Sequence, residues 1–203
     1  MRLATWCYCI RGFWVTLVAP TVPLPPVVYA TFSGLIDAQS ITRIFNAVGN
    51  ATQNGVTEVH LLFQSAGGII NDGISLYNFV RGLSIELHMY NAGAVQSVAV
   101  LPFIAAKHRH VSEHGVFFLH KSAFTPLAVA TEAAQFKALY DSLIADDVRT
   151  EVIIKAYTKI PASKYPVRRG RGITIGAQDA VNFGIADDIC EFTVPPGNQT
   201  FNI

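Results

Sequence analysis

The sequence predicts an α/β fold built from βαβ units, in which parallel strands alternate with helices. The main observation is that short stretches rich in β-branched and aromatic residues alternate with stretches whose apolar residues recur at helical spacing. A second observation is that the 203 residues, 51% of them hydrophobic, suffice for one full core and show no internal repeat. We therefore expect one domain over residues 27–203, preceded by an extension over residues 1–26.

The extension differs in composition from the rest of the chain. A short apolar run over residues 13–19 is followed by several prolines. The run is too short to span a bilayer, which needs about 20 apolar residues. A secretory signal ending at Val28-Tyr29-Ala30 is one interpretation, but its removal would take away the start of the first strand. We expect instead a poorly ordered extension, or translation from an upstream start codon.

Residues 27–119 are expected to form the alternating part of the fold. Asp37 can accept hydrogen bonds from free N–H groups, so we expect it to cap the first helix. Turns that contain glycine separate several of the elements. The expected strands are 27–32, 58–63, 84–90 and 116–119, and the expected helices are 38–50, 69–81 and 96–106.

After residue 121 the alternation gives way to a longer helical pattern. Residues 122–130 are small and largely apolar. The elements expected beyond them are a long helix over 131–157, a basic and turn-rich segment over 160–172, a short helix over 177–183 and a closing strand over 185–194.

The composition limits the possible partners. Charged residues are only 14% of the chain, against roughly 25% in ordinary globular proteins. This deficit indicates more buried surface than a monomer needs, so we expect self-association. A net charge of +1 gives no electrostatic reason to expect nucleic acid or an acidic membrane as a partner. The three cysteines, Cys7, Cys9 and Cys190, cannot all pair, which favours a reducing, cytoplasmic location.

Three predicted strand ends carry candidate chemistry. Gly67-Gly68 follows one strand, Ser97 lies at a helix start after the next, and His120 ends a third. Ligands of parallel sheets bind beyond the carboxyl ends of the strands, so we expect these residues at one site. Ser97 would be a nucleophile activated by His120, and backbone N–H groups at the glycines would stabilise an oxyanion. The structural alternatives are a helix cap, a partly buried histidine and a tight turn.

The sequence offers little evidence of a metal or a cofactor. Cys7 and Cys9 form a CxC pair that lacks a second pair of ligands. His108, His110 and His114 lie in a polar segment, where the spacing of the last two resembles paired ligands on a helix but lacks the HExxH motif. We interpret this segment as a solvated turn and expect neither a metal nor a cofactor.

Taken together, these segments resemble the ClpP family, the proteolytic subunits of ATP-dependent Clp proteases. The resemblance covers residues 27–189, and the order and approximate spacing of the motifs agree. HLLFQSAGGIINDGISLY is similar to the strand–SPGG–helix segment of the family, with Gly67, Gly68, Gly73 and Tyr77 matching. NAGAVQSVAV is similar to GQAASMGA, with Gly93 and Ser97 matching, VFFLHKS to VMIHQP, and AQDAVNFGIADDI to APEAVEYGLVDSI.

The resemblance implies a crotonase/ClpP-like spiral of βαβ units with a protruding handle helix, and a serine-type endopeptidase. By this resemblance Ser97 is the nucleophile, His120 is the base, and the backbone N–H groups of Gly68 and Val98 form the oxyanion hole. The helix from Thr131 becomes the handle. Rings of seven subunits, stacked in pairs around a chamber, are also implied. Peptides or unfolded proteins would be the substrates, and an AAA+ unfoldase would be a possible partner.

Three departures from the family pattern stand out. The triad aspartate falls on Gly172, and no Asp or Glu occurs from residue 152 to residue 178. Loss of such an aspartate costs about 10⁴ in rate in a well-studied triad. Gln96 replaces a small residue beside the nucleophile, and Ala66 replaces a proline. Residues 1–26 do not resemble the family's N-terminal loops, which line the axial entrance, so they give no support for docking to an unfoldase.

Three functions remain open from the sequence. The preferred one is a serine endopeptidase that uses Ser97 and His120 without the usual aspartate. A carboxylate such as Asp187, or one from a neighbouring subunit, would restore a triad, whereas a backbone carbonyl or water would imply a dyad. The second is a catalytically weak or inactive subunit of a mixed ring, which Gly172 favours. The third is a crotonase-type acyl-CoA enzyme, against which the matching serine and histidine argue.

Overall fold

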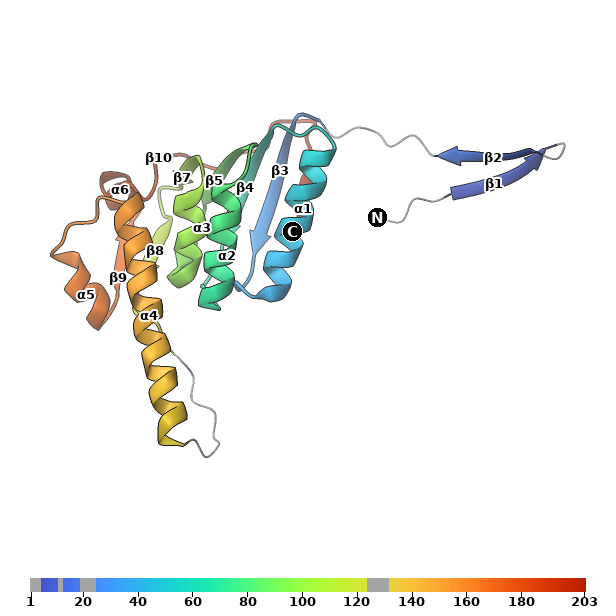
Figure 1. The fold of residues 1–203 in the computed structure, drawn as a ribbon. Coiled ribbons are helices and arrows are strands. Elements are labelled where there is room, and N and C mark those ends of the chain that lie inside the picture. The colour runs from blue at the N-terminus through green and yellow to red at the C-terminus, as the bar shows by residue number, and fades with distance from the viewer. Residues whose placement is uncertain (1–4, 11–12, 19–24, 124–131) are drawn as a thin grey trace.

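The computed structural model describes residues 5–10, 13–18, 25–123 and 132–203 of the chain. Its centre is a six-stranded sheet in the order β10-β7-β5-β4-β3-β11, in which every neighbouring pair is parallel. Parallel neighbours need crossovers, and helices α1, α2 and α3 lie together over one face of the sheet (Figure 1). The predicted α/β class of βαβ units is confirmed. The strands are β3 (Val27–Ser33), β4 (Glu58–Gln64), β5 (Glu86–Asn91), β7 (His108–Val111), β10 (Asp188–Ile189) and β11 (Thr200–Asn202), and the helices are α1 (Ala38–Gln53), α2 (Ile70–Arg81) and α3 (Val100–Ala105).

A smaller three-stranded sheet holds the elements closest to the candidate site. Strand β6 (Ala94–Gln96) pairs in parallel with β8 (Val116–Leu119), which pairs antiparallel with β9 (Ile173–Gly176). A one-turn 3₁₀ helix, η1 (Ser97–Ala99), leads from β6 into α3. The remaining helices are α4 (Ala133–Tyr157), α5 (Lys164–Gly170) and α6 (Ala177–Asn182). The long helix α4 projects beyond the ends of the other helices (Figure 1).

Strands β1 (Thr5–Ile10) and β2 (Phe13–Val18) form an antiparallel hairpin within the first 26 residues. The sequence analysis assigned no element to this segment. Its strands pair with each other and belong to neither of the other two sheets. Within the residues that the structure describes, no helix combines the length and the apolar character that a membrane crossing requires.

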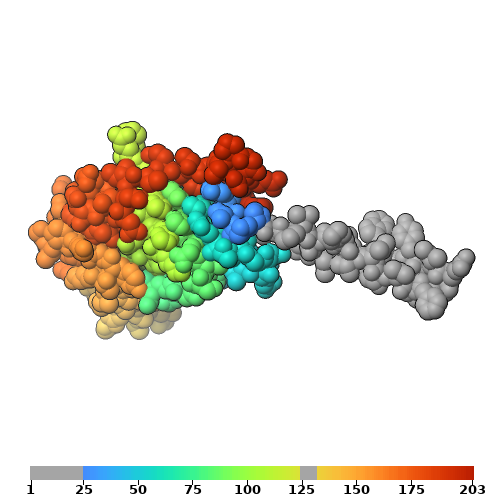
Figure 2. Space-filling model, turned by 90° about the horizontal axis from the view of Figure 1, so that it is seen from above, coloured from blue at the N-terminus to red at the C-terminus, as the bar shows by residue number. Residues whose placement is uncertain are grey.

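The two faces of the central sheet differ in character. Along β4, Val59, Leu61 and Phe63 are buried in the core, as the period of two in a strand requires. Glu58 and His60 alternate with these residues along the strand, lie on the opposite face and are partly exposed. The C-terminal segment runs along one side of the molecule and α1 and α2 along the other (Figure 2). This second face of the sheet therefore has polar side chains and little helical cover.

The predicted cap of the first helix is confirmed. The Asp37 carboxylate accepts a hydrogen bond from the Ser40 backbone N–H at 2.8 Å, and the Ser40 hydroxyl accepts one from the Asp37 N–H at 3.0 Å. These two bonds form a capping box. The bond from the Ser40 N–H stabilises the charged carboxylate, which lowers the pKa of Asp37.

Several boundaries and elements differ from the predictions. The polar segment around residues 108–111 is strand β7 rather than a turn, because only Val111 of this strand is buried and no apolar alternation marks it. The basic segment over 160–172 contains helix α5, and the predicted closing strand over 185–194 is reduced to the two residues of β10. Strands β6, β9 and β11 were not predicted. The predicted start of the long helix, Thr131, lies outside the described residues.

Glu151 of α4 forms ion pairs with three cations, two of them, Arg168 and Arg169, on α5. Its carboxylate lies 2.6 Å from Nη2 of Arg169, 2.8 Å from Nζ of Lys155 and 3.2 Å from Nη1 of Arg168. Arg168 is buried, at 3% exposure, and also lies 3.4 Å from the hydroxyl of Thr150. The hydrogen bond from Arg169 is the main reason that the pKa of Glu151 falls to about 2. This cluster fixes the segment that leads into β9.

We expect Glu151→Gln to destabilise the protein at pH 7 by roughly 2–3 kcal/mol. The folded-state pKa lies below the ordinary value of 4.5, so the stabilisation is present above that value and is lost as the pH falls towards 2. Chemical denaturation at pH 7 and at pH 3 measures the difference, which should shrink at the lower pH. Asp141→Asn, in the exposed pair with Lys137, is the control and should change stability by less than about 0.5 kcal/mol. An equal loss for Glu151→Gln at both pH values would contradict the prediction.

Candidate active site

Ser97 lies at the junction of β6 and η1 with an unusual backbone conformation. Its φ angle is 55°, and among the residues that the structure describes it is the one non-glycine residue with a positive φ. Such a conformation costs an L-residue about 1–2 kcal/mol, and backbone strain of this kind clusters at functional sites. The Ser97 side chain lines a cavity of about 800 Å³.

Three glycines allow other elements to approach Ser97 closely. A Cβ on Gly67 would lie 2.6 Å from the Cβ of Ser97, and a Cβ on Gly73 of α2 would lie 2.2 Å from Cγ2 of Val98. A Cβ on Gly68 would lie 2.1 Å from the carbonyl oxygen of Ile36. Glycine is therefore required at Gly67 and Gly73, where the β4–α2 turn and α2 pack against this junction, and at Gly68, where the turn packs against Ile36.

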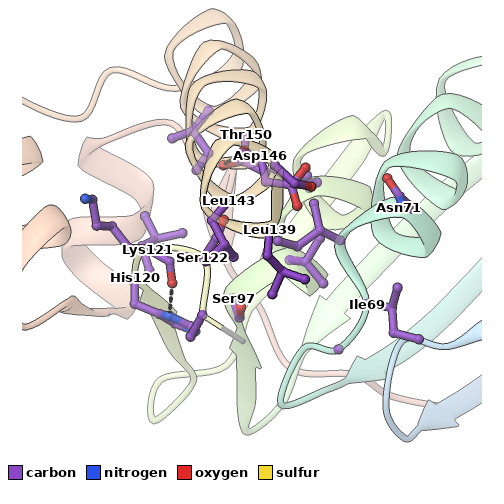
Figure 3. Close-up of a pocket in the computed structure, with 18 of the residues that line it drawn as sticks. Ile69, Asn71, Ser97, His120, Lys121, Ser122, Leu139, Leu143, Asp146 and Thr150 are labelled. Carbon is purple, nitrogen blue, oxygen red and sulfur yellow. Dashed lines mark hydrogen bonds between the residues drawn. The ribbon is translucent and has the colours of Figure 1, made fainter. Parts of the chain in front are cut away.

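His120 follows the end of β8 and lines the same cavity as Ser97. Its Nδ1 lies 2.5 Å from the carbonyl oxygen of Lys121 (dashed in Figure 3). A carbonyl only accepts hydrogen bonds, so Nδ1 carries the proton and a neutral His120 has its lone pair on Nε2. The next residue, Ser122, is tied to α4 by a 2.7 Å hydrogen bond from its N–H to the Asp147 carboxylate.

The Ser97 and His120 side chains share the cavity without a direct hydrogen bond between them in the described structure. Leu139 and Leu143 of α4 line the same cavity (Figure 3). Catalytic hydrogen bonds are often long before substrate binds, so this arrangement is compatible with a nucleophile and base. The predicted strand-end residues are thus brought together at one place.

Two backbone donors lie on the cavity wall beside Ser97. Gly68 and Val98 both line the cavity, and the N–H of neither donates a hydrogen bond to another described residue. Gly68 is held by its neighbours, because the Ile69 N–H donates to the Ile36 carbonyl at 2.8 Å and the Ile36 N–H to the Gly67 carbonyl at 2.9 Å. N–H groups that are fixed and free can stabilise an oxyanion.

The position expected for a triad aspartate, Gly172, has no side chain, and the ring of Phe118 lies beside it. Gly172 has φ +81°, and a Cβ there would lie 2.6 Å from Cζ of Phe118 and 3.2 Å from the Leu119 carbonyl oxygen. The Phe118 ring also stacks on His120, with ring centroids 5.4 Å apart. The Phe118 ring is therefore a neighbour of both Gly172 and His120. Gly172 was identified from the sequence, but the packing of Phe118 against it was not.

Asp187 does not supply the missing carboxylate. It forms an ion pair with the guanidinium of Arg109 and accepts a 2.9 Å hydrogen bond from the Arg109 backbone N–H. Among the described residues the partner of His120 is the Lys121 carbonyl. Within the described part of one chain, His120 therefore has a backbone carbonyl rather than a carboxylate as its partner.

The histidines noted in the sequence do not form the helical pair that their spacing resembled. His108 and His110 lie on β7, and His114 follows in an exposed turn. The structure instead groups Glu58, His60 and His88, whose ligand atoms all lie within 4.8 Å of one another. The sequence analysis missed this group. The signal was an alternation of polar residues at period two in the expected strands, as in Glu58-x-His60. The side chains of Cys7 and Cys9 lie outside the described residues.

Two comparisons relate this chain to known proteins. A family model described as Clp protease matches residues 31–193. The chain is similar to "ATP-dependent Clp protease proteolytic subunit 2" of Chlamydia pneumoniae and to "ATP-dependent Clp protease proteolytic subunit 1" of Chlamydia felis (strain Fe/C-56). Each is 23% identical over 138 residues, which are 65% of this chain and 64% of the relative. The chain thus spans less than two thirds of the length of these curated relatives.

Proposed function

Because the chain belongs to the Clp protease family, we propose that it is a serine endopeptidase in which Ser97 is the nucleophile and His120 the general base. The observation that carries this proposal is the convergence of Ser97, His120 and two free backbone N–H groups on one cavity. The positive φ of Ser97 adds support, since backbone strain of this kind clusters at functional sites.

The proposed reaction is acyl transfer through a dyad. Ser97 Oγ attacks the peptide carbonyl while His120 Nε2 takes its proton, and the N–H groups of Gly68 and Val98 stabilise the oxyanion. His120 then protonates the leaving amine. In the second step His120 takes a proton from water, which attacks the acyl-enzyme, and returns that proton to Ser97 Oγ as the acid is released. The Lys121 carbonyl orients the imidazole through Nδ1–H. It is neutral, so it stabilises the imidazolium less than a carboxylate would, and slow turnover follows.

The proposal includes self-association through α4. Five apolar side chains four residues apart form a stripe along this helix, and each is at least 41% exposed: Phe136, Tyr140, Ile144, Val148 and Val152. A stripe of this spacing is one face of a helix, which in a soluble protein is normally covered. Stacked heptameric rings, peptide or unfolded protein substrates, an AAA+ unfoldase as a partner and a cytoplasmic location are proposed from family membership.

Labelling with a fluorophosphonate or β-lactone probe tests the catalytic proposal. The assembled species, separated by size-exclusion chromatography, is expected to label stoichiometrically at Ser97. Ser97→Ala should abolish labelling and His120→Ala should slow it by about 10³-fold or more, because the serine then lacks its base. Ser122→Ala, at another serine on the cavity wall, is the control and should label normally. Equal labelling of wild type and Ser97→Ala would exclude Ser97 as the nucleophile.

A second candidate function is a non-catalytic subunit of a mixed ring. The observation that favours it is the Phe118 ring beside Gly172, which a side chain at the triad position would have to displace. In this case the chain alone would remain unlabelled and would co-purify with a second Clp-type chain that does label. Robust peptidase activity of the homo-oligomer would exclude this candidate.

A further inference from the structure

The face of the central sheet opposite α1–α3 carries a row of aromatic rings across four neighbouring strands. The parallel register places Tyr29 beside His60, His60 beside His88, and His88 beside His108. Successive ring centroids are 4.9, 4.5 and 4.1 Å apart, with interplanar angles of 13–16°. Three of the four rings are imidazoles, which are commoner as metal ligands than any other side chain.

Three donor atoms converge within this row, two from β4 and one from β5. Nε2 of His60 lies 2.7 Å from Oε1 of Glu58, and Nε2 of His88 lies 3.5 Å from the same oxygen. Around a zinc ion in tetrahedral coordination, donor atoms about 2.0–2.2 Å from the metal lie about 3.3 Å from one another. The two distances to Oε1 of Glu58 lie on either side of this value, and all ligand atoms of the three residues are within 4.8 Å of one another, so binding of an ion requires adjustment of the side chains.

The hydrogen bonds on the Nδ1 side of His88 determine which of its nitrogens has a lone pair. Nδ1 of His110 lies 2.6 Å from the Asp188 carboxylate, so it is the nitrogen that carries the proton in a neutral ring. Nε2 of His110 then accepts from Nδ1–H of His88, 3.2 Å away. The lone pair of a neutral His88 is consequently on Nε2, which faces Glu58.

His60 has a comparable partner behind it. Its Nδ1 lies 2.9 Å from the hydroxyl of Tyr90, and its Nε2 lies 2.7 Å from Oε1 of Glu58. In the structure the Glu58 carboxylate accepts from Nε2–H of His60, and Nδ1 accepts from the Tyr90 hydroxyl. Binding of a cation at Nε2 requires the other tautomer, in which Nδ1–H donates to the Tyr90 hydroxyl. Ligating histidines in metal sites almost always have such a partner on the second nitrogen. Without a cation, the lone pair of His88 instead faces the Glu58 carboxylate, which is unfavourable.

We propose that Glu58, His60 and His88 bind a divalent transition-metal ion of the zinc class. Two imidazoles and one carboxylate are a common zinc ligand set and leave at least one coordination position for water or for a residue of a partner. The side chains are 17% (His60), 19% (His88) and 35% (Glu58) exposed, so an ion can reach them from solvent. The site is separate from the Ser97 cavity, since these residues do not line it. The proposal is therefore independent of peptidase activity.

Zinc titration of the full chain tests this site. Cys7→Ser/Cys9→Ser is used as the background, because a CxC pair also binds zinc. After removal of metal, competition with a chromogenic indicator should show one Zn²⁺ bound with a Kd of about 10 μM or tighter. His88→Gln, His60→Gln and Glu58→Gln should each weaken binding at least tenfold, and Tyr90→Phe should weaken it about tenfold. Co²⁺ should give a visible absorption spectrum that depends on His60 and His88.

Two matched controls separate this site from nonspecific binding by histidine. His114→Gln alters an exposed histidine outside the row, and His108→Gln alters the ring next to His88 whose Nε2 is already 3.0 Å from Glu86. Both should change the Kd by less than about threefold. Glu58→Gln is nearly isosteric at a half-exposed position, so it tests the site even if a histidine variant fails to fold. Absence of binding, or binding that these three residues do not affect, would overturn the proposal.

Discussion

Gly68→Ala is expected to destabilise the protein by roughly 3–5 kcal/mol and to slow active-site labelling by about 10²–10³-fold. The new Cβ would lie 2.1 Å from the carbonyl oxygen of Ile36, and the φ of +156° is one that L-residues rarely adopt. Backbone cannot rotate away as a flexible side chain can, so the β4–α2 turn must move. The Gly68 N–H, the proposed oxyanion donor, moves with it, which is the reason for the expected loss of labelling rate.

Chemical denaturation and the second-order rate of fluorophosphonate labelling measure the two parts of this effect. Gly49→Ala is the matched control. It lies within α1, where an added Cβ meets nothing within 4 Å, so it should stabilise the protein by about 0.5–1 kcal/mol and leave labelling unchanged. If Gly68→Ala keeps both the stability and the labelling rate of wild type, the packing at Ile36 described here is incorrect.

Gly172→Asp combined with Phe118→Val is expected to raise peptidase activity by at least about tenfold, with an upper limit near the 10⁴-fold worth of the aspartate in a well-studied triad. Valine lacks the Cζ and Cε2 atoms that lie 2.6 and 2.8 Å from a Cβ at position 172. It also retains the β-branched character suited to strand β8. The new carboxylate would replace the Lys121 carbonyl as the partner of His120 Nδ1 and would stabilise the imidazolium.

The single variants are the controls for this prediction. Gly172→Asp alone should be destabilised and no more active, because the Phe118 ring occupies the space. Phe118→Val alone should lose the contact with His120 and gain no activity. The cleavage rate of a fluorogenic peptide, measured against pH, reports the change, and Ser97→Ala in the double variant should remove it. An unchanged rate in a correctly folded double variant would favour the non-catalytic function.

Sequence patterns were sufficient for the elements with apolar periodicity. The helix over 70–81 and the strand over 116–119 follow their predicted ranges closely, because each buries a regular set of side chains. Strand β7 was missed for the opposite reason. His108 and His110 stack on other rings of a half-exposed face, and such contacts between strands leave no local hydrophobic signal.

The sequence predicted which residues form the candidate site but not the contacts between them. Strand ends of a parallel sheet converge, so Gly68, Ser97 and His120 were expected at one place without knowledge of any distance. The partner of His120 Nδ1 and the ring that closes the position of Gly172 depend on how β8 and β9 pair, which no local pattern encodes.

The sequence by itself determined the α/β class, the family resemblance, the residues offered for catalysis and the absence of an aspartate near Gly172. These follow from residue types and short-range spacing, which the chain carries irrespective of its folding. Only the tertiary structure decided that His120 is oriented by a backbone carbonyl, that Phe118 blocks the triad position, and that Glu58, His60 and His88 converge. The physical reason is that these relations join strands far apart in the sequence, and their geometry is set by register and packing across the sheets.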